Sequence, residues 1–312
     1  MPLAIMCSGQ GRQHPGMFSL TGNAPEAEEL FGYCAHLIGD VDPRQAVQRE
    51  PTDTLHNNRM GQILCTLQSL AMFETLKACL HSNVVVAGYS VGEVAAWGIC
   101  GSFTHTETLE LVSMRAILMD AESLPGDGLL FIRGLSRDAI DVLCAKGGAS
   151  ISIINPGDAY IVGGRRSALD AIARTARDRR ASRVAFVPVM VASHTPLLSG
   201  AAKRFHEVLR NASNTFSLSP GVRLLSGIDG SAVIDVDTGL ANLAKQISHT
   251  VQWSTCLRSC IEAGATAFLE LGPGNALSEM VRAVYPDVPS RSVEEFHSVA
   301  GVRDWISSHS SG

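Results

Sequence analysis

The sequence predicts an α/β fold with a parallel sheet and, inserted near its middle, a small ferredoxin-like unit. Three observations lead to this prediction. Short apolar runs alternate with longer segments of helical periodicity, a pattern typical of parallel strands joined by helices. The order of elements changes between about Gly128 and Val187. The chain has 312 residues, 46% of them hydrophobic, which suffices to bury a large core and a second, smaller one.

Eight short apolar runs predict the strands. The first stops at Ser8-Gly9 and has no positively charged leader, so we expect a buried strand and not a signal peptide. No run reaches the ~18 apolar residues of a membrane span. The predicted strands are Leu3–Cys7, Asn83–Ala87, Leu129–Arg133, Ser150–Ile154, Tyr160–Gly163, Val184–Val191, Val222–Ser226 and Thr266–Leu271.

Longer segments between these runs have helical periodicity. Apolar residues recur in them three and four positions apart, so each segment offers one apolar face to a core. A further helix is expected from Gly92 onward. The clearest segments are Gly61–Leu80, Thr106–Ala121, Ser136–Lys146, Ser167–Asp178 and Pro196–Leu209.

The middle of the chain follows a different order. It reads strand, helix, strand, a turn at "NPGD", strand, helix and strand, which is the βαββαβ order of a ferredoxin-like unit. We therefore expect a main domain made of residues 1–125 and 191–312 and an inserted subdomain of residues 126–190.

Charge and cysteine content narrow the function. The formal net charge is −5 and no long basic run occurs. Proteins that bind nucleic acid need a basic surface, so we do not expect this chain to bind nucleic acid. The eight cysteines are scattered, without CxxC pairs. Scattered cysteines within apolar runs indicate reduced thiols, so we expect a cytoplasmic protein that binds neither nucleic acid nor membrane.

A serine between two glycines follows the second predicted strand. In "VVVAGYSVGE", Gly88, Ser90 and Gly92 form a G-x-S-x-G pattern between a strand and a helix. Such a turn pushes the serine hydroxyl out at the carboxyl end of the strand, and the next helix directs N–H groups toward a developing oxyanion. Ser90 is therefore a candidate nucleophile; the alternative is a strand-to-helix turn that merely needs its glycines.

A serine nucleophile needs a base, and one histidine stands out. "VAFVPVMVASHTP" places His194 directly after a long predicted strand, where catalytic side chains of α/β sheets gather. The chain order of a plain esterase would instead need His249 or His297 together with Asp229 or Asp237. The ten candidate histidines are His14, His36, His56, His81, His105, His194, His206, His249, His297 and His309.

One arginine lies on the apolar face of its predicted helix. The residues three and four positions from Arg115 are apolar: Leu111, Val112, Leu118 and Met119. A buried guanidinium needs a partner, and its planar fork suits a carboxylate. That carboxylate is either a structural Asp or Glu or an acid carried by a substrate acyl group near Ser90; alternatively the head group reaches the surface.

A glycine loop follows the first predicted strand. "SGQGRQ" lacks the third glycine of a dinucleotide-binding fingerprint and the Gly-Lys-Ser/Thr of a P-loop. A loop beside the nucleophile can instead lend a backbone N–H group to an oxyanion.

Several motifs together resemble one family. With "SGQGRQ", "GYSVGE", "MRA", "ASHTPLL", "TVQW" and "LELGPG" in this order, the chain resembles the malonyl-CoA:acyl-carrier-protein transacylase family, which includes the acyltransferase domains of polyketide and fatty-acid synthases. The resemblance covers about residues 3–285. Within this family, "GYSVGE" looks most like the transacylase (epsilon) subunit of malonate decarboxylase.

The resemblance implies a fold and a set of catalytic residues. The family fold is an α/β-hydrolase-like core with a ferredoxin-like insertion. Ser90 would be the nucleophile and His194 its base, held by a backbone carbonyl at Gln252 in place of an acidic residue. The backbone N–H groups of Gln10 and Val91 would bind the oxyanion.

The resemblance also assigns substrate contacts. Arg115 would bind the malonyl carboxylate, Gln62 would lie near the acyl group, and Asn155 begins a segment similar to the family's Asn-Ser-Pro-Gly-Gln stretch. Carrier proteins of such systems are acidic, and Arg183, helped by Arg179 and Arg180, is the candidate contact for one.

The implied reaction moves malonyl from malonyl-CoA through a malonyl-serine to the pantetheine thiol of an acyl carrier protein, and it needs no metal or redox cofactor. The resemblance favours the carrier protein of malonate decarboxylase; a fatty-acid or polyketide loading enzyme, an acyl-CoA thioesterase or esterase, and a carrier-docking scaffold are the alternatives. Two departures from the family concern acyl selectivity: Tyr89 replaces the usual His, and Cys7-Ser8 replaces Phe-Pro.

Overall fold

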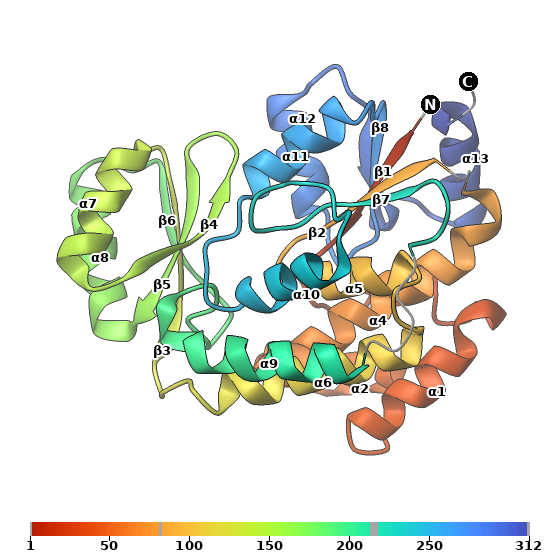
Figure 1. Ribbon diagram of the computed structural model, residues 1–312, viewed down its shortest axis with the longest axis horizontal. Coiled ribbons are helices and arrows are strands. Elements are labelled where there is room, and N and C mark those ends of the chain that lie inside the picture. Colours follow the sequence, from red (N-terminus) through yellow and green to blue (C-terminus); the bar gives the residue numbers. More distant parts are fainter. Residues whose placement is uncertain (1, 81–82, 213–217, 311–312) are drawn as a thin grey trace.

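Two separate sheets organise the chain (Figure 1). A computed structural model describes residues 2–80, 83–212 and 218–310. One sheet is parallel, in the order β7-β2-β1-β8-β9, and the other is antiparallel, in the order β4-β5-β3-β6. The predicted α/β fold with a parallel sheet and a ferredoxin-like insertion is confirmed.

The parallel sheet forms the centre of the larger unit. Its middle strands are apolar and buried on both faces, as expected of a parallel sheet covered by helices. The short polar segment "SRS" adds an edge strand that no apolar run predicted. The strands are β7 Val222–Leu224, β2 Val84–Gly88, β1 Leu3–Cys7, β8 Ala267–Glu270 and β9 Ser290–Ser292.

Helices surround this sheet, and two of them matter for the site. Helix α4 is almost entirely buried, and α6 packs along it after a capping box formed by Thr104 and Glu107. Their bounds are α4 Asn58–Leu76 and α6 His105–Asp120. The other helices of this unit are α1 Glu28–Leu37, α2 Pro43–Arg49, α3 Thr52–Leu55, α5 Gly92–Ile99, α9 Ser199–Ala212, α10 Val236–Lys245, α11 Trp253–Glu262, α12 Ala276–Val284 and α13 Val299–Ser310. None of the helices described is apolar and long enough to cross a membrane.

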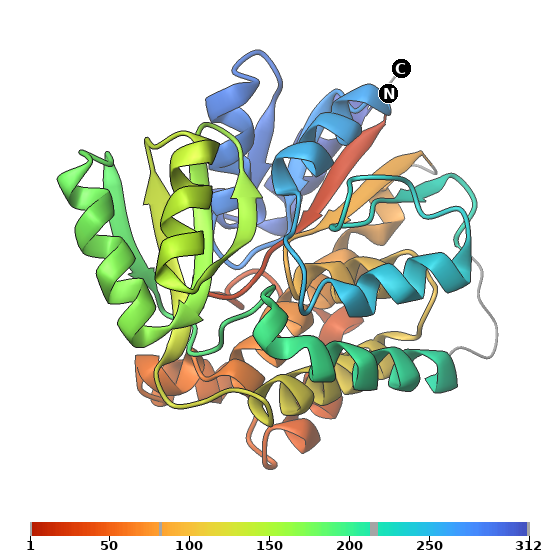
Figure 2. The ribbon, with the colours of Figure 1, turned by 60° about the vertical axis from the view of Figure 1, so that its left-hand side comes forward.

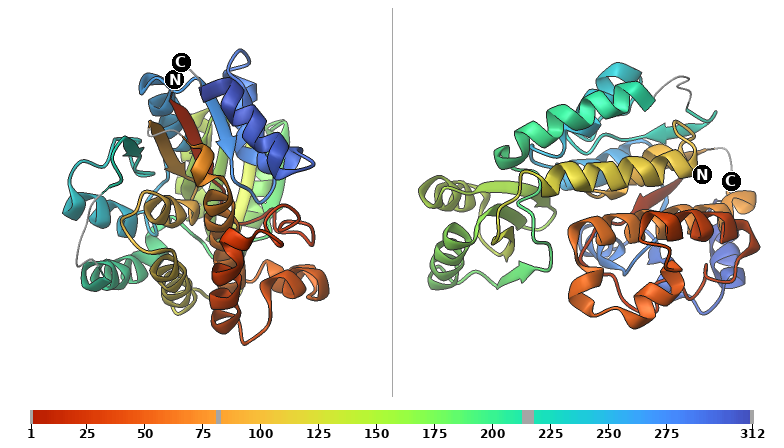
Figure 3. Two further views of the ribbon diagram at one scale, coloured as in Figure 1. Left: turned by 90° about the vertical axis from the view of Figure 1, so that its right-hand side faces the viewer. Right: turned by 90° about the horizontal axis from the view of Figure 1, so that it is seen from below.

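The small sheet carries two helices and has its own apolar core. In the right-hand view of Figure 3 it projects from one end of the larger unit. Its elements are β3 Asp127–Arg133, α7 Arg137–Gly147, β4 Ser150–Asn155, β5 Ala159–Arg165, α8 Arg166–Asp178 and β6 Arg183–Val187. The domain boundaries at residues 125/126 and 190/191 stay a prediction.

Two features join the sheets. Strand β1 runs toward the small sheet (Figure 2), and Ile153 of β4 forms an isolated bridge with Val251 of the larger unit. The Thr250 hydroxyl also donates to the Ile151 carbonyl at 2.7 Å. The residues that follow β1 and β2 line one cavity together with residues of the small sheet.

One predicted strand is too long. The run Val184–Val191 forms a strand only as far as Val187, because Pro188 has no N–H group to continue the ladder. The chain then crosses back to the larger unit in a loop, so His194 does not directly follow a strand.

Candidate active site

Ser90 lies in a tight turn between β2 and α5. Its φ is 57°, in the left-handed region. A Cβ atom on Gly88 would lie 2.1 Å from the Glu93 nitrogen, and one on Gly92 would lie 2.2 Å from the Cys7 carbonyl oxygen. Both glycines are therefore required by close packing, and the turn is the strained one that the G-x-S-x-G pattern predicts.

Ser90 and His194 form a hydrogen-bonded pair. Ser90 Oγ lies 2.7 Å from His194 Nε2, and His194 Nδ1 lies 2.5 Å from the Gln246 carbonyl oxygen. Because a carbonyl only accepts, Nδ1 carries the hydrogen, which leaves Nε2 free to accept the serine proton. The imidazole is oriented as a general base.

Burial and the positive charge of Arg115 lower the pKa of His194 to about 3, and the bond to Gln246 opposes this shift only partly. The neutral form is the one that accepts a proton from Ser90. The folded protein thus keeps His194 in its basic form throughout the neutral pH range.

The carbonyl that holds His194 was predicted at Gln252, and this is wrong. The Gln252 carbonyl accepts hydrogen bonds from the N–H groups of Thr255 and Cys256 and so begins α11. The contact belongs to Gln246, six residues earlier, directly after α10. Val251 is tied to the small sheet, which directs the "VQW" segment away from His194.

The esterase-like alternative places its groups elsewhere. The side chains of His249, His297, Asp229 and Asp237 are exposed, and His249 Nδ1 contacts Ser248 and the Lys245 carbonyl. His81, another of the ten candidates, lies outside the residues described. The residue paired with Ser90 is His194.

The loop after β1 packs against the serine. A Cβ atom on Gly9 would lie 2.8 Å from the Tyr89 carbonyl oxygen and 3.5 Å from Ser90 Cβ. Gln10 lines the same cavity as Ser90. In residues 2–80, 83–212 and 218–310, no acceptor is paired with the N–H group of Gln10 or of Val91. Both groups are thus available to an oxyanion next to Ser90.

Arg115 is buried behind Ser90 and held by two amides. It is 1% exposed, Nη1 donates to Gln62 Oε1 at 2.5 Å, and Nη2 donates to Gln246 Oε1 at 3.1 Å. Its Nε has no hydrogen-bond partner within the described part of the chain. Burial lowers the pKa of Arg115 to about 10, and the charge of Glu93 partly offsets this.

These contacts exclude two of the three interpretations of Arg115 and leave the third, a substrate carboxylate, as a prediction. The head group does not reach the surface, and among the described residues no carboxylate forms an ion pair with it. Arg115 does not line the large cavity itself. Gln62, predicted near the acyl group, is fully buried and orients the guanidinium, while its own Nε2 donates to Asn58 Oδ1 at 2.7 Å.

Two residues of the site escaped prediction. Gln246 Nε2 donates to the Ser90 carbonyl at 3.0 Å and to Glu93 Oε2 at 2.5 Å. Glu93 is 1% exposed, and burial raises its pKa to about 7. The signal for Glu93 was its place as the last residue of "GYSVGE", in the first turn of α5; no local pattern marks Gln246.

A cavity of about 470 Å³ lies in front of Ser90 and His194. Its apolar walls come from both units and include Leu129, Phe131 and Ile161 of the small sheet and Leu277 and Met280 of α12. Apolar side chains and the reactive pair thus line one cavity, as in many sites that bind small organic groups.

Arginines border this cavity. Arg183 was predicted; Arg12 and Arg133 were not, and all three line it. Arg133 and Arg183 are paired across β3 and β6, with their guanidinium carbons 5.9 Å and 5.7 Å from the centre of the Phe131 ring. Arg179 and Arg180 are exposed and do not line the cavity.

Tyr89 borders the cavity beside the serine. Its ring meets that of Trp253 edge to face at 5.3 Å between centres. Burial raises the pKa of Tyr89, and the nearby Asn155 side chain partly offsets the rise. Asn155, predicted near the substrate, is buried at the end of β4 and does not line the cavity, so its predicted role near the acyl group stays a prediction.

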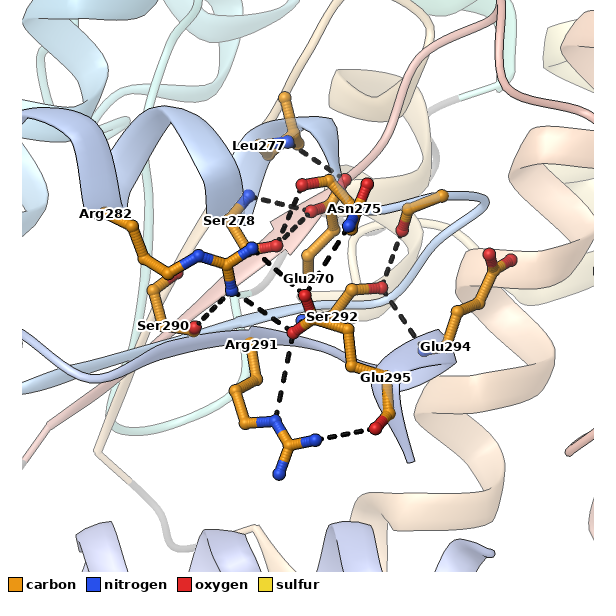
Figure 4. A network of polar contacts seen from close by, with 11 residues as sticks. Glu270, Asn275, Leu277, Ser278, Arg282, Ser290, Arg291, Ser292, Glu294 and Glu295 are labelled. Carbon is orange, nitrogen blue, oxygen red and sulfur yellow. Dashed lines mark hydrogen bonds and ion pairs between the residues drawn. The ribbon is translucent and has the colours of Figure 1, made fainter. Parts of the chain in front are cut away.

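A buried carboxylate anchors the glycine loop. Glu270, at the end of β8, accepts hydrogen bonds from the Ser8 hydroxyl at 2.9 Å and from the N–H groups of Leu277 and Ser278 at 3.2 Å and 2.8 Å. Figure 4 shows Glu270 at the start of α12, beside Glu295 with its partners Arg282 and Arg291. Ser8, one of the departures from the family, thus ties the loop that carries Gln10 to α12.

Comparisons with known proteins identify the family of the chain. Residues 5–304 match the acyl transferase domain family. The malonyl CoA-acyl carrier protein transacylase of Haemophilus influenzae is 26% identical over 313 residues, covering 97% of this chain and 98% of that protein. The spectinabilin polyketide synthase system protein NorB of Streptomyces orinoci is 28% identical over 92% of this chain, which corresponds to 14% of that protein.

Solved structures share the fold. The structure of the malonyl CoA-acyl carrier protein transacylase from Coxiella burnetii superimposes with a TM-score of 0.89 at 24% identity, covering 100% of this chain and 98% of that one. A type II polyketide synthase acyl-carrier protein in complex with its malonyl-transacylase gives a TM-score of 0.89 at 23% identity, over 99% of this chain and 100% of that one. Both likenesses extend over the two sheets of this chain.

Proposed function

The chain belongs to the acyl transferase domain family, and on that premise we propose that it moves a malonyl group from malonyl-CoA to the pantetheine thiol of an acyl carrier protein. The observation that carries this proposal is the contact between Ser90 Oγ and His194 Nε2 at 2.7 Å, with the Arg115 guanidinium joined to both residues through Gln246. In this proposal the nucleophile Ser90, the base His194 and the buried cation Arg115 all act on one malonyl group.

The reaction proceeds in two half-reactions at Ser90. His194 Nε2 accepts the hydroxyl proton as Oγ attacks the thioester carbon, and the N–H groups of Gln10 and Val91 bind the oxyanion. The carbon–sulfur bond breaks, coenzyme A takes the proton from His194, and a malonyl-Ser90 ester remains. The pantetheine thiol then gives its proton to His194, and its sulfur attacks the ester carbon. The bond from that carbon to Ser90 Oγ breaks, Oγ takes the proton back from His194, and the malonyl group leaves on the new thioester.

Arg115 selects the acyl group. Two of its five N–H groups are held by Gln62 and Gln246, which leaves others to bind the malonyl carboxylate. An acetyl group has no carboxylate to accept hydrogen bonds from these N–H groups. Leaving a buried polar group without a hydrogen bond costs ~1–3 kcal/mol. We expect malonyl-CoA to be preferred over acetyl-CoA by about tenfold or more.

The carrier protein is a second part of the proposal. Because relatives named for malonyl transfer and for polyketide synthesis both match most of this chain, a carrier of fatty-acid or polyketide synthesis is favoured. Tyr89 in "GYSVGE" is the feature that favours the carrier of malonate decarboxylase. In either case Arg183, with Arg12 and Arg133, would contact the acidic carrier at the mouth of the cavity.

Mass spectrometry after incubation with malonyl-CoA tests the function. We expect a malonyl adduct on Ser90 that is absent from the Ser90→Ala variant and disappears when a holo-carrier protein is added. Steady release of free coenzyme A without carrier would indicate a thioesterase, and no adduct at all would leave the scaffold alternative. Comparing the two kinds of holo-carrier then identifies the pathway.

A further inference from the structure

Gln246 touches all three residues on which the proposed reaction depends. Its backbone carbonyl accepts from His194 Nδ1 at 2.5 Å. Its side-chain Nε2 donates to the Ser90 carbonyl at 3.0 Å, and its Oε1 accepts from Arg115 Nη2 at 3.1 Å. The orientation of this one side chain therefore determines one of the two hydrogen bonds that hold Arg115, the other being the bond to Gln62.

The contacts allow that amide only one orientation. A glutamine amide can rotate by half a turn and exchange its oxygen and nitrogen. The Ser90 carbonyl and an ionised Glu93 only accept, so both require the NH₂ group, whereas Arg115 only donates and requires the oxygen. Of the two acceptors, Glu93 forms the shorter contact, 2.5 Å against 3.0 Å for the Ser90 carbonyl.

Glu93 is itself firmly held. It lies in the first turn of α5, is 1% exposed, and its Oε1 accepts from the Gly227 N–H group at 3.1 Å. A Cβ atom on Gly227 would lie 2.5 Å from Glu93 Oε2, so the loop after β7 leaves room for this carboxylate only because it has a glycine there. These contacts hold the Glu93 carboxylate in one position.

We propose that Glu93 is a positioning residue for acyl selectivity. Its carboxylate fixes the Gln246 amide, and through that amide it holds the Arg115 guanidinium in the orientation that binds the carboxylate of the acyl group. Glu93 does not touch the substrate. The role in selectivity rests on the proposed malonyl transfer, whereas the hold of Glu93 on Gln246 does not.

Replacing the carboxylate tests this role. Glu93→Met keeps the length of the side chain but offers no acceptor to Gln246. Because small misplacements of a binding group cost up to ~100-fold, we expect the preference for malonyl-CoA over acetyl-CoA, as a ratio of kcat/KM values, to fall about tenfold or more. The KM for malonyl-CoA should carry most of the loss, and acetyl transfer should change little, because the backbone carbonyl of Gln246 still holds His194.

Glu93→Gln is the conservative variant and keeps one acceptor oxygen for two donors. Its malonyl preference should lie between those of the wild type and Glu93→Met. Asp127→Asn is the matched control, since Asp127 is also a buried carboxylate but pairs with Arg165, does not line the cavity and does not contact Gln246. Its ratio of malonyl to acetyl kcat/KM should equal that of the wild type.

A double-mutant cycle shows whether Glu93 acts through Gln246. In the Gln246→Ala background, which retains the backbone carbonyl, Glu93→Met should change the malonyl preference by less than about twofold. An equal effect of Glu93→Met in both backgrounds would overturn the proposal, as would an equal loss with malonyl-CoA and acetyl-CoA.

Crystal structures of Glu93→Met and Glu93→Gln give a readout that does not depend on activity. We expect the Gln246 side chain of Glu93→Met to have left the Ser90 carbonyl or Arg115. A Gln246 side chain that still bridges both in Glu93→Met contradicts the proposal, even in a protein that forms no malonyl adduct. A wild type without the adduct, by contrast, refutes only the proposed function.

Discussion

At the scale of single residues, His194 and Arg115 influence each other through charge. The guanidinium is one cause of the low pKa of His194, second to burial. When His194 accepts the serine proton it becomes a second buried cation near Arg115, which is unfavourable. A malonyl carboxylate that neutralises Arg115 removes part of this penalty. The acid of the acyl group is therefore expected to strengthen the base as well as to aid binding.

Arg115→Ala separates the two acyl groups. The variant should lose malonyl transfer and gain acetyl transfer, because the carboxylate loses its partner and acetyl no longer leaves a buried cation unpaired. We expect the ratio of kcat/KM values for malonyl-CoA and acetyl-CoA to fall at least about tenfold. An unchanged ratio would show that Arg115 does not bind the acyl group.

The protonation state of His194 can be observed directly. Since its pKa is lowered to about 3, the ring should remain neutral with hydrogen on Nδ1 at pH 6, and ¹⁵N NMR of the imidazole measures this. In Arg115→Ala the pKa should rise, because the cation that lowers it is gone. An imidazolium signal from the wild type at pH 6 would contradict the assignment of His194 as a neutral base.

At the scale of elements, loops at the ends of strands bring the site together. The loop after β1 carries Gln10, the turn after β2 carries Ser90, and Glu270 at the end of β8 joins the first loop to α12 through Ser8. The geometry of the oxyanion donors thus depends on one buried carboxylate that takes four hydrogen bonds.

Glu270 makes the stability of the fold depend on pH. Burial raises its pKa to about 7, from 4.5. Between pH 4.5 and about 7, Glu270 keeps its proton in the folded protein but releases it in the unfolded chain. The free energy of unfolding therefore falls as the pH rises through this range and no longer changes above about pH 7. A rise in pKa from 4.5 to about 7 changes the free energy of unfolding by roughly 3 kcal/mol between acid and neutral pH.

Glu270→Gln checks this dependence, because glutamine does not titrate. The free energy of unfolding of the variant, relative to the wild type, should increase from pH 4.5 to 7 when measured by chemical denaturation at several pH values. A difference that is constant over this range would show that Glu270 is already ionised at pH 5.

At the scale of the whole molecule, the cavity exists only because the two units face each other. The reactive pair comes from the larger unit, but much of the apolar wall and two of the three bordering arginines come from the small sheet. A carrier arm must enter between the units. The partner that presents the arm is therefore expected to touch both.

Arg183→Glu tests this docking. The KM for the holo-carrier protein should rise by about tenfold, since the charge reversal replaces attraction by repulsion near an acidic partner, whereas Ser90 should still become malonylated. Arg179→Glu is the matched control, because Arg179 is exposed and does not line the cavity. Carrier kinetics that are equal in both variants would remove Arg183 from the contact.

The sequence predicted those parts of the site that are local. Ser90 is marked by its glycines and its strand, and the ferredoxin-like order is visible in the alternation of apolar runs. His194 was selected for its place after a predicted strand, but that strand ends at Val187 and belongs to the small sheet. The structure brings His194 Nε2 within 2.7 Å of Ser90 Oγ, and its role as the base stays a prediction. Its location therefore depends on a crossing loop and not on a strand end of the parallel sheet.

The contacts of Gln246 could not be predicted, because its partners come from segments far apart in the chain. Ser90 is 156 positions away, Glu93 153 and Arg115 131. The "VQW" segment looked suitable for holding His194, but its pairing with β4 is a tertiary contact that redirects the Gln252 carbonyl. Hydrophobic periodicity predicts single helices and strands and contains no information on tertiary contacts between distant segments.

The left-handed turn at Ser90 has a consequence for the stability of the protein. With φ at 57° for Ser90 and 61° for His194, two residues with side chains occupy a conformation that costs roughly 1–2 kcal/mol each. Ser90→Gly should therefore melt at a higher temperature than the wild type while being inert, and calorimetry can show it. A higher melting temperature of Ser90→Gly would mean that the wild-type turn keeps a reactive hydroxyl at the cost of thermal stability.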